Sequence, residues 1–583
     1  MAPFSRAVSI SARSAALLSA AFAASALAAP DPLGAALQRA LVWHGGAAPG
    51  AYVAARATFT PQASLSAPML AVFADSRYVA FVNGVRAGAG GPERFDWRAP
   101  TYDTIDLGPL LELGSPNTLV LLAHNYDTCG GAQAPGNMPE VCKVADASSW
   151  WLDTPSGRYM NHVPGLAAAV VDGDSGAIVF ATSAGATWRT SNATRYGASR
   201  AVWASVPDNI DGRVDGGDAA FLRPGFDDGA WAAAVAVDGA QWGPLRPRGV
   251  PRLRHTPVSL ALLGGGALPL ALNETHPMAV FDAGAQVLAF YAASLAAVSA
   301  PGLVVSLTWF ERRDAATGAL SHSYTTSTYA TAGAAAERFE TADVFGGRYV
   351  RVALSGSGSA VLVSMNATDA RYPLELVASF DVPGEPFFAR LFAMAAATIS
   401  VNAADSFTDC STRERAEWLG DAVVNEHNAT RLAFATLEDD GSTTYADARL
   451  LRGVLKRAAL SSRSFYPTAF QIRAHTASDR LDFNGVWWVF NTTSLKLWYA
   501  HPTCTPNHRI SRATGATMAW PRSRASRASS PPRVTRPLCP ARGRTGAHRC
   551  CGSLAACSRA AASASSARPS SSPTLSSLTL PAA

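Results

Sequence analysis

The interpretation of this chain starts from one segment, Asp409-Cys410-Ser411-Thr412-Arg413-Glu414-Arg415-Ala416-Glu417-Trp418-Leu419-Gly420-Asp421. It places four carboxylates, two arginines and a tryptophan in thirteen residues, whereas only 16% of the whole chain is charged. The sequence before it is rich in short apolar runs typical of strands, and the sequence after it soon loses any globular pattern. Clustered carboxylates are the groups that glycoside hydrolysis uses. The segment therefore directs attention to carbohydrate chemistry.

The length and charge of the chain set outer limits on its class. With 583 residues it has room for roughly three or four domains with real cores. Residues 505–583 carry 12 Arg and no acidic residue, so residues 1–504 hold 37 basic and 43 acidic side chains, a net charge of −6. The overall charge of +6 therefore comes from the C-terminal stretch. The folded part is mildly acidic, and we expect no nucleic-acid partner.

The N-terminus has the pattern of a secretory leader. Arg6 and Arg13 form a basic region, Ala15–Ala24 is apolar, and Ala26-Leu27-Ala28 is a small-x-small cleavage site. The alternative, an uncleaved anchor, is disfavoured because the apolar run is short for a membrane span. We therefore predict a signal peptide over residues 1–28, a secreted or extracytoplasmic protein, and no membrane span once the leader is removed. Five sequons fit passage through a glycosylating compartment: Asn192, Asn273, Asn366, Asn428 and Asn491.

Cysteine spacing favours a disulfide over a metal site. Cys129 and Cys142 bracket a loop rich in Gly and Pro, and a disulfide could close that loop in a secreted protein. No set of Cys and His residues has the spacing of zinc ligands. We predict no metal and no cofactor.

The part before residue 373 is predicted to form two antiparallel β-sandwich modules. Short apolar runs without intervening helices indicate a jelly-roll-like, sugar-binding-like sandwich over residues 36–245, or two modules if it divides near 158. A proline-interrupted basic connector, Leu245–Arg254, leads into a second sandwich, counted as residues 246–372. The main strand candidates are Met69–Phe73, Tyr78–Asn83, Tyr102–Leu107, Thr118–Ala123, Leu166–Val171, Leu303–Phe310, Tyr349–Leu354 and Ala360–Met365.

From residue 373 to 503 the pattern becomes helical. Phe387–Val401 is Ala-rich, lacks Pro and Gly, and has apolar residues at helical spacing. Further helices are predicted over 412–426, 443–461 and 485–500. Residues 504–583 consist mainly of Arg, Ser, Ala and Pro, a composition that cannot bury a core, so we predict a disordered low-complexity tail. A reading frame that departs from the natural one near residue 504 would give the same pattern.

The charged segment admits a functional and a structural interpretation. If a helix begins near Ser411, then Glu414, Trp418 and Asp421 share one face, and Asp409 leans over its end. An indole beside carboxylates suits a sugar, because the flat ring packs against C–H groups while the carboxylates bind hydroxyls. In the structural interpretation, Ser411-x-x-Glu414 is a capping box and Arg413 with Glu417 is an ordinary i, i+4 pair.

The segment resembles the signature of bacterial α-L-rhamnosidases of glycoside hydrolase family 78. That signature reads approximately Asp-Cys-Pro-x-Arg-Glu-Arg-x-x-Trp-x-Gly-Asp-Ala, and nine of its ten defined positions match at the same spacing. The departure is Ser411 in place of Pro, and both residues suit a helix start. Weaker similarity upstream, for example at Arg77–Val85, extends the resemblance over roughly residues 60–500.

The resemblance implies a fold and a set of roles. It implies that residues 373–503 form the start of an (α/α)6 six-hairpin catalytic barrel, and that the enzyme hydrolyses terminal α-L-rhamnosyl linkages with inversion. Glu414 matches the general acid. Asp409 and Asp421 match carboxylates that hold the sugar hydroxyls. Trp418 matches an aromatic wall, and Arg413 matches an arginine that orients the acids.

The general base is the component that the sequence does not supply. Inversion needs a second carboxylate across the sugar to activate water. The resemblance places that residue later in the barrel, and residues 505–583 contain no Asp or Glu. Glu438, Asp439 and Asp482 lie upstream, but nothing marks any of them as the base. We therefore interpret the chain as an incomplete α-L-rhamnosidase. The alternative is a secreted carbohydrate-binding protein with a vestigial catalytic domain.

The missing base gives a direct prediction. The purified chain of residues 1–583 should release little or no rhamnose from an aryl α-L-rhamnoside in a chromogenic assay. Without a base, no group activates the attacking water. Turnover at the 1–10³ s⁻¹ that is typical of enzymes would contradict this expectation.

Overall fold

The computed structural model describes most of residues 31–500. The described chain leaves out 49, 92, 94–99, 126–163, 200–205, 413–414, 416–421, 423–426, 461–462, 467–468, 474–486 and 492–495. From residue 455 onward it describes the backbone alone. The described residues belong to one compact unit, Met1–Arg509. The predicted leader, the loop between Cys129 and Cys142 and the predicted tail lie outside the described residues.

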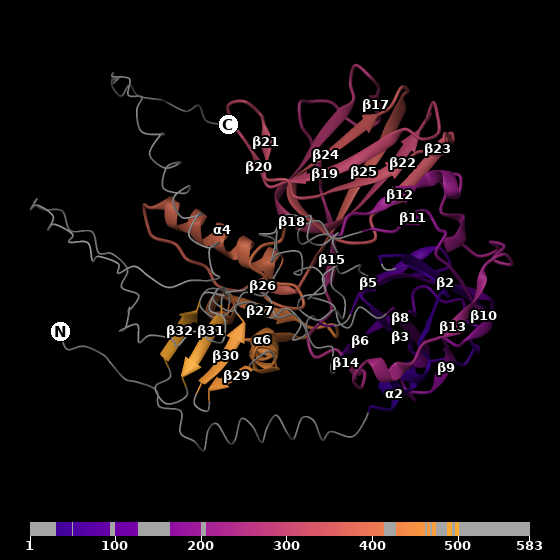
Figure 1. Ribbon diagram of the computed structural model, residues 1–583. Helices are drawn as coiled ribbons and strands as arrows, with labels where there is room; N and C mark the ends of the chain where they lie inside the picture. Colours follow the sequence, from indigo (N-terminus) through magenta and orange to yellow (C-terminus); the bar gives the residue numbers. More distant parts are fainter. Residues whose placement is uncertain are drawn as a thin grey trace, which may run out of the picture. The chain divides into compact units, whose positions relative to one another are not determined.

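The first sandwich is a single sheet that folds over on itself. Its strand order is β14-β6-β3-β8-β1-β13-β10-β2-β7-β4-β5, and β9 also pairs with β8 (Figure 1). All pairs are antiparallel except that of β14 with β6. Its elements are α2 (Pro32–Arg39), β1 (Val42–Trp43), β2 (Tyr52–Phe59), β3 (Pro68–Asp75), β4 (Arg77–Val82), β5 (Val85–Gly90), β6 (Thr101–Asp106), β7 (Asn117–His124), β8 (Gly165–Asp172), β9 (Ile178–Ala181), β10 (Gly185–Ser191), β13 (Ala232–Ala236), η4 (Gly239–Gln241) and β14 (Arg246–Pro247).

The central strands of this sheet are buried on both faces, which explains their near-continuous apolar sequences. In β2, Val53 and Ala55 point into the core of the first sandwich, whereas Tyr52 and Ala54 point into the core of the second. Successive side chains of a strand face opposite ways, so each face contributes to a different core. On the other half of the sheet, β3 and β8 are covered by α2 and Trp242. The strands predicted at 69–73, 78–83, 102–107, 118–123 and 166–171 are confirmed.

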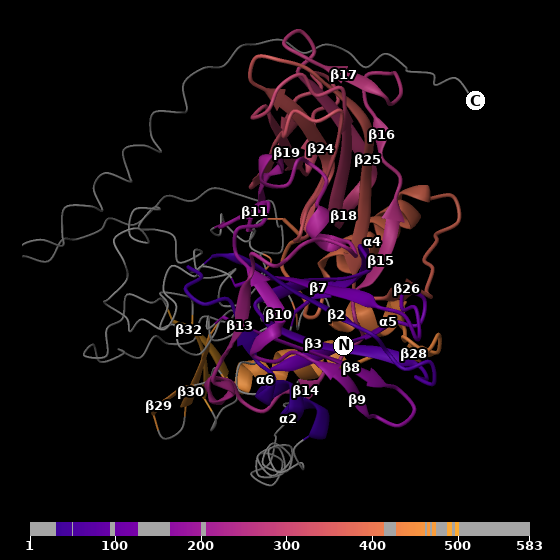
Figure 2. The same cartoon turned by 90° about the vertical axis from the view of Figure 1, so that its right-hand side faces the viewer.

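The second sandwich is built around one long strand. β18 runs for 19 residues and pairs with both β24 and β25, with a register shift between Asp282 and Val287 (Figure 2). The predicted strands at 303–310, 349–354 and 360–365 are confirmed. Its elements are β15 (Arg254–Val258), β16 (Ala261–Leu262), β17 (Leu270–Leu272), β18 (Met278–Ala296), β19 (Val304–Phe310), β20 (Arg312–Arg313), β21 (Leu320–Ser321), β22 (Thr326–Ala330), β23 (Ala336–Glu340), β24 (Phe345–Ser355) and β25 (Ala360–Arg371).

Two short strands cross the boundary that the sequence predicted at residue 245. β11 (Tyr196–Gly197) pairs with β12 (Asn209–Asp211), and β12 pairs in parallel with β22 of the second sandwich. The 3-10 helices η2 (Gly212–Val214) and η3 (Ala220–Leu222) follow, and Phe221 and Leu222 pack into the second core.

The region after residue 373 mixes helices with small sheets. The predicted helix at 387–401 is confirmed as α4 (Pro386–Asn402). The helix predicted over 485–500 is wrong, because its described residues form the strands Trp487–Asn491 and Lys496–Ala500. The run Trp487-Trp488-Val489-Phe490 is aromatic and β-branched, a composition that favours strands. The other elements are β26 (Leu374–Leu376), α5 (His427–Ala433), β27 (Phe434–Leu437), β28 (Thr443–Tyr445), α6 (Arg449–Leu460), β29 (Arg463–Tyr466), β30 (Ala469–Arg473), β31 (Trp487–Asn491) and β32 (Lys496–Ala500).

β-Sandwich modules are thus present as predicted, although β11 and β12 join the second sheet from before residue 245. A six-hairpin barrel stays a prediction. Within the described chain, no helix is both long and apolar enough to cross a membrane.

A buried polar cluster lies where the two sandwiches meet. Asp208 is fully buried, and its carboxylate accepts hydrogen bonds from the Tyr52 hydroxyl and, at 2.9 Å, from the Ala342 amide. His124 stacks on Tyr52 with ring centroids 3.8 Å apart. Asp343 lies 3.9 Å from the Arg77 guanidinium of β4. Side chains of both sandwiches therefore converge on residues 342 and 343.

Burial shifts the pKa values of two groups in this cluster, Asp208 and His124. Their contributions to stability therefore change with pH in opposite directions. Burial and the nearby Asp343 carboxylate raise the pKa of Asp208 to about 7, although the hydrogen bond from Tyr52 acts in the opposite direction. Burial also lowers the pKa of His124 to about 4. Between pH 4 and 7, folded Asp208 keeps a proton that the unfolded chain has lost, so its contribution to stability falls as pH rises. The contribution of His124 rises with pH, because only the unfolded chain binds its proton between pH 4 and 6.5.

The difference between wild type and Asp208→Asn isolates the contribution of Asp208. We expect the free energy of unfolding of the variant, relative to wild type, to increase between pH 4.5 and 7.5 and then to level off. The pKa shift of Asp208 limits the total increase of this difference to about 4 kcal/mol. Urea unfolding followed by tryptophan fluorescence at several pH values measures this difference. A difference that does not vary with pH would show that Asp208 does not titrate in this range.

Candidate functional site

The structure describes only part of the predicted site. Asp409 is described, whereas Arg413, Glu414, Trp418 and Asp421 lie outside the described residues. Their neighbours Cys410, Ser411, Thr412, Arg415 and Ala422 are described. The surroundings of the segment can therefore be built from residues on both sides of Glu414.

The loop before the segment is fixed to the end of α4. The Thr408 hydroxyl donates a hydrogen bond of 2.9 Å to the Asn402 carbonyl, and the Asn402 amide donates one of 3.3 Å to the Asp409 carbonyl. Phe407 is buried in a small apolar core. That core also contains Ala422 from the far end of the segment, together with Val250, Tyr372, Ala403, Leu450 and Val454. Apolar packing therefore anchors the chain before and after the predicted site residues.

The helix predicted over 412–426 does not pass through residue 415. Arg415 has a φ of 49°, in the left-handed region, where a right-handed helix cannot continue. Gln286 Nε2 donates a hydrogen bond of 3.2 Å to the Ser411 hydroxyl, whereas Glu414, the other member of the predicted capping box, lies outside the described residues. The shared helix face proposed for Glu414, Trp418 and Asp421 itself lies outside the described residues.

The described residues of the segment contact the second sandwich closely. A Cβ added to Gly346 of β24 would lie only 2.2 Å from the Ser411 carbonyl oxygen, so the two backbones touch. The Thr412 hydroxyl donates to the Glu311 carboxylate, and Arg415 Nη1 donates to the Val344 carbonyl at 3.2 Å. These contacts could not be predicted, since nothing in the pattern of the sandwich strands marks Glu311 or Gly346.

A separate cluster accounts for one of the acids considered as a base. Arg449 forms a two-point ion pair with Glu438, with N–O distances of 2.9 and 2.5 Å, and this pair lowers the pKa of the Glu438 carboxyl. Arg449 also binds Asp447, which accepts a hydrogen bond of 2.7 Å from the Tyr372 hydroxyl. A carboxylate committed to an arginine in this way is a weak base, so the geometry assigns Glu438 a structural role.

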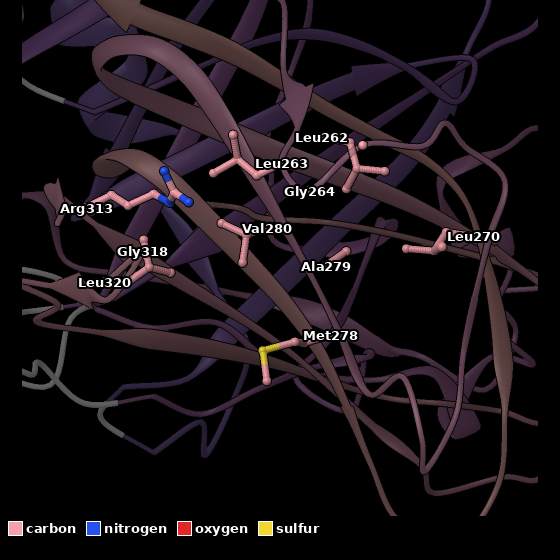
Figure 3. Close-up of a pocket in the computed structure, with 11 residues that line it drawn as sticks. Leu262, Leu263, Gly264, Leu270, Met278, Ala279, Val280, Arg313, Gly318 and Leu320 are labelled. Carbon is pink, nitrogen blue, oxygen red and sulfur yellow. The ribbon is translucent and has the colours of Figure 1, made fainter. Parts of the chain in front are cut away.

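A pocket of about 380 Å³ lies on the second sandwich (Figure 3). It is lined mainly by aliphatic side chains of the β16–β18 region, and Arg313 reaches its rim from the β20–β21 hairpin. None of the described residues of the charged segment lines it. Elsewhere in the described chain, no group of three His, Cys, Asp or Glu side chains is arranged to hold a metal ion.

The comparison with known proteins rests on structure. No protein-family model matches the chain, and no curated protein matches it in sequence. A family 78 rhamnosidase of Bacillus sp. GL1 is similar in structure, with a TM-score of 0.56 and 16% identity over 72% of this chain and 62% of that one. The α-L-rhamnosidase of Aspergillus terreus has a TM-score of 0.50 and 16% identity, covering 76% of this chain and 47% of that one.

The matched part of the chain has the fold of the corresponding part of these rhamnosidases. It spans about three-fifths of the length of the Bacillus protein and about half of the Aspergillus one. The rhamnosidase fold and the rhamnosidase-like segment therefore occur in the same chain.

The ion pair of Glu438 leads to a prediction that distinguishes a role in stability from a role in sugar binding. Glu438→Gln should lower the free energy of unfolding by about 0.5–1.5 kcal/mol, because a partly exposed charged hydrogen bond to Arg449 is lost. The variant should bind L-rhamnose as wild type does in isothermal titration calorimetry. Asp440→Asn, a change at an exposed turn, serves as the control for the loss of one negative charge. A loss of sugar binding in Glu438→Gln alone would place Glu438 in the site instead.

Proposed function

We propose that this chain is a glycoside hydrolase of α-L-rhamnosidase type, and that the segment 409–421 binds the rhamnosyl group. The observation that carries the proposal is the coincidence of two independent features. The described residues of the segment are packed between α4 and the second sandwich, and the chain around them has a rhamnosidase fold. The two features are independent, because the segment matches the rhamnosidase signature in sequence, whereas the fold was matched by structure at only 16% sequence identity.

In this proposal three of the four acids of the segment each have one task. Glu414 protonates the departing glycosidic oxygen, while Asp409 and Asp421 accept hydrogen bonds from the sugar hydroxyls. Trp418 packs against the C–H face of the ring, and Arg413 orients the carboxylates. Hydrolysis with inversion then needs a further carboxylate, about 6.5–9.5 Å from Glu414, that removes a proton from the attacking water. A six-hairpin barrel that begins at residue 373 would supply the frame for both acids.

The proposed setting is extracytoplasmic. Asn192 and Asn366, the asparagines of two sequons, have exposed side chains, as glycosylation requires. A carbohydrate-binding protein is the second candidate. This candidate requires only the sugar-holding residues of the segment 409–421, because sugar binding needs no second carboxylate.

Binding and hydrolysis test the proposal together. Isothermal titration calorimetry of the full chain should detect L-rhamnose, and Asp409→Asn should weaken its binding roughly tenfold or more, because a charge-assisted hydrogen bond is lost. Glu414→Gln should keep most of the binding and lose the residual hydrolysis of an aryl α-L-rhamnoside, to which a general acid contributes roughly 10²–10⁴-fold.

The matched control is Asp381→Asn, which removes one exposed carboxylate that lies well before the segment in the sequence. It should bind L-rhamnose as wild type does. If wild type binds no L-rhamnose, or if Asp409→Asn binds it as well as Asp381→Asn does, the proposed site is wrong. Binding with no detectable hydrolysis in any of the variants would favour the carbohydrate-binding protein over the enzyme.

A further inference from the structure

The segment 341–346, just before and at the start of β24, is held from two sides. From the first sandwich, Arg86 Nη2 donates a hydrogen bond of 3.0 Å to the Thr341 carbonyl, and Arg77 forms an ion pair with Asp343. From the other side, Arg415 donates to the Val344 carbonyl, and the Ser411 backbone touches Gly346. We call residues 341–346 the seat. It connects the first sandwich to the residues that flank Glu414.

The fit between the seat and the charged segment leaves no room for a side chain at Gly346. A Cβ there would lie 2.2 Å from the Ser411 carbonyl oxygen, 2.7 Å from its carbonyl carbon and 2.8 Å from Thr412 Cγ2. Two of these atoms belong to backbone, which cannot rotate away as the end of a flexible side chain can. Glycine is therefore required at 346 by the position of Ser411.

Two side chains of the second sandwich extend the contact. Glu311, which follows β19, accepts the hydrogen bond of the Thr412 hydroxyl, and Gln286, in the irregular part of β18, donates to Ser411. Thr412 and Ser411 are 5% and 4% exposed, so the contact excludes water. A buried hydroxyl that loses its partner costs about 1–3 kcal/mol, which favours one position for this stretch of chain.

The anchored residues lie on both sides of the proposed acid. Thr412 precedes Glu414 by two residues, and Arg415, which is 2% exposed, follows it directly. Adjacent Cα atoms are 3.8 Å apart, so fixing residues 412 and 415 restricts the volume in which residue 414 can lie. A general acid works only within hydrogen-bond reach of its target oxygen, so this restriction has catalytic consequences.

We propose that the second β-sandwich positions the acid-bearing segment, with Gly346 and Glu311 as positioning residues for Glu414. The inference rests on the proposed function for its catalytic meaning. Neither residue touches the sugar in this account. Gly346 sets how closely Ser411 approaches β24, and Glu311 holds the Thr412 side chain. The first sandwich contributes indirectly through Arg77 and Arg86, which hold the far side of the seat.

The test uses four variants of the full chain in two matched pairs. Gly346→Ala places a methyl group against Ser411, whereas Gly347→Ala places one 3.0 Å from Trp309 Cβ and 3.2 Å from Phe310 N, within the sandwich. Thr412→Val keeps the shape of Thr412 but removes the donor to Glu311, and Thr412→Ser keeps the donor. The pairs separate displacement of the segment from general damage to β24 or to the core.

Two readouts are measured for each variant. The first is the affinity for L-rhamnose by calorimetry. The second is the rate at which Cys410 reacts with a maleimide, followed by mass spectrometry of the peptide that contains it, since Cys410 is partly exposed and precedes Ser411. We expect Gly346→Ala and Thr412→Val to weaken L-rhamnose binding roughly tenfold and to change the Cys410 rate, and Gly347→Ala and Thr412→Ser to resemble wild type in both.

Each outcome has one meaning. If wild type binds L-rhamnose, and Gly346→Ala and Thr412→Val match wild type in both readouts, the positioning role is overturned while the proposed function stands. If wild type binds no L-rhamnose but the Cys410 rate changes in the expected variants, the proposed function fails and the seat stands. If wild type binds no L-rhamnose and the Cys410 rate is the same in all variants, both are overturned. Should Gly346→Ala not fold, the Thr412 pair decides by the same criteria.

Discussion

The contact between the Gly346 backbone and the Ser411 carbonyl is the constraint on which the rest of the site depends. Two backbones can approach this closely only where one residue has no Cβ. The contact fixes the charged segment against a strand of the second sandwich, and hydrogen bonds from Gln286 and to Glu311 surround it. At Gly346, β24 is paired with β18, so the segment rests on a hydrogen-bonded strand of the second sandwich.

The same strand region also connects the two sandwiches. The sheet of the first sandwich buries its outer face in the core of the second, so the two modules share apolar surface as well as the buried Asp208, Tyr52 and Asp343 cluster. Buried polar groups of this kind fix relative position because each needs its own partner. The first sandwich, whatever it binds, thereby helps to hold the frame on which the acidic segment lies.

The β architecture could be predicted from sequence because strand periodicity and turns are local signals. Runs such as 69–73 and 118–123 are apolar on both faces, and the structure shows why, since each face meets a different core. Helix prediction failed at 485–500, where Trp487 and Trp488 belong to a strand, and at Arg415, whose positive φ has no sequence signal. The contacts of Gly346, Glu311 and Gln286 with the segment join residues 65 to 125 positions apart in sequence, so no local pattern could reveal them.

A crystal structure of the full chain soaked with L-rhamnose tests the central claim most directly, because it locates the sugar without requiring turnover. The account predicts electron density for the sugar within hydrogen-bond distance of the Asp409 carboxylate, with the Ser411 backbone still in contact with Gly346. Sugar density confined to the first sandwich, with none beside Asp409, would contradict the account and identify the protein as a carbohydrate-binding module on a rhamnosidase-like frame.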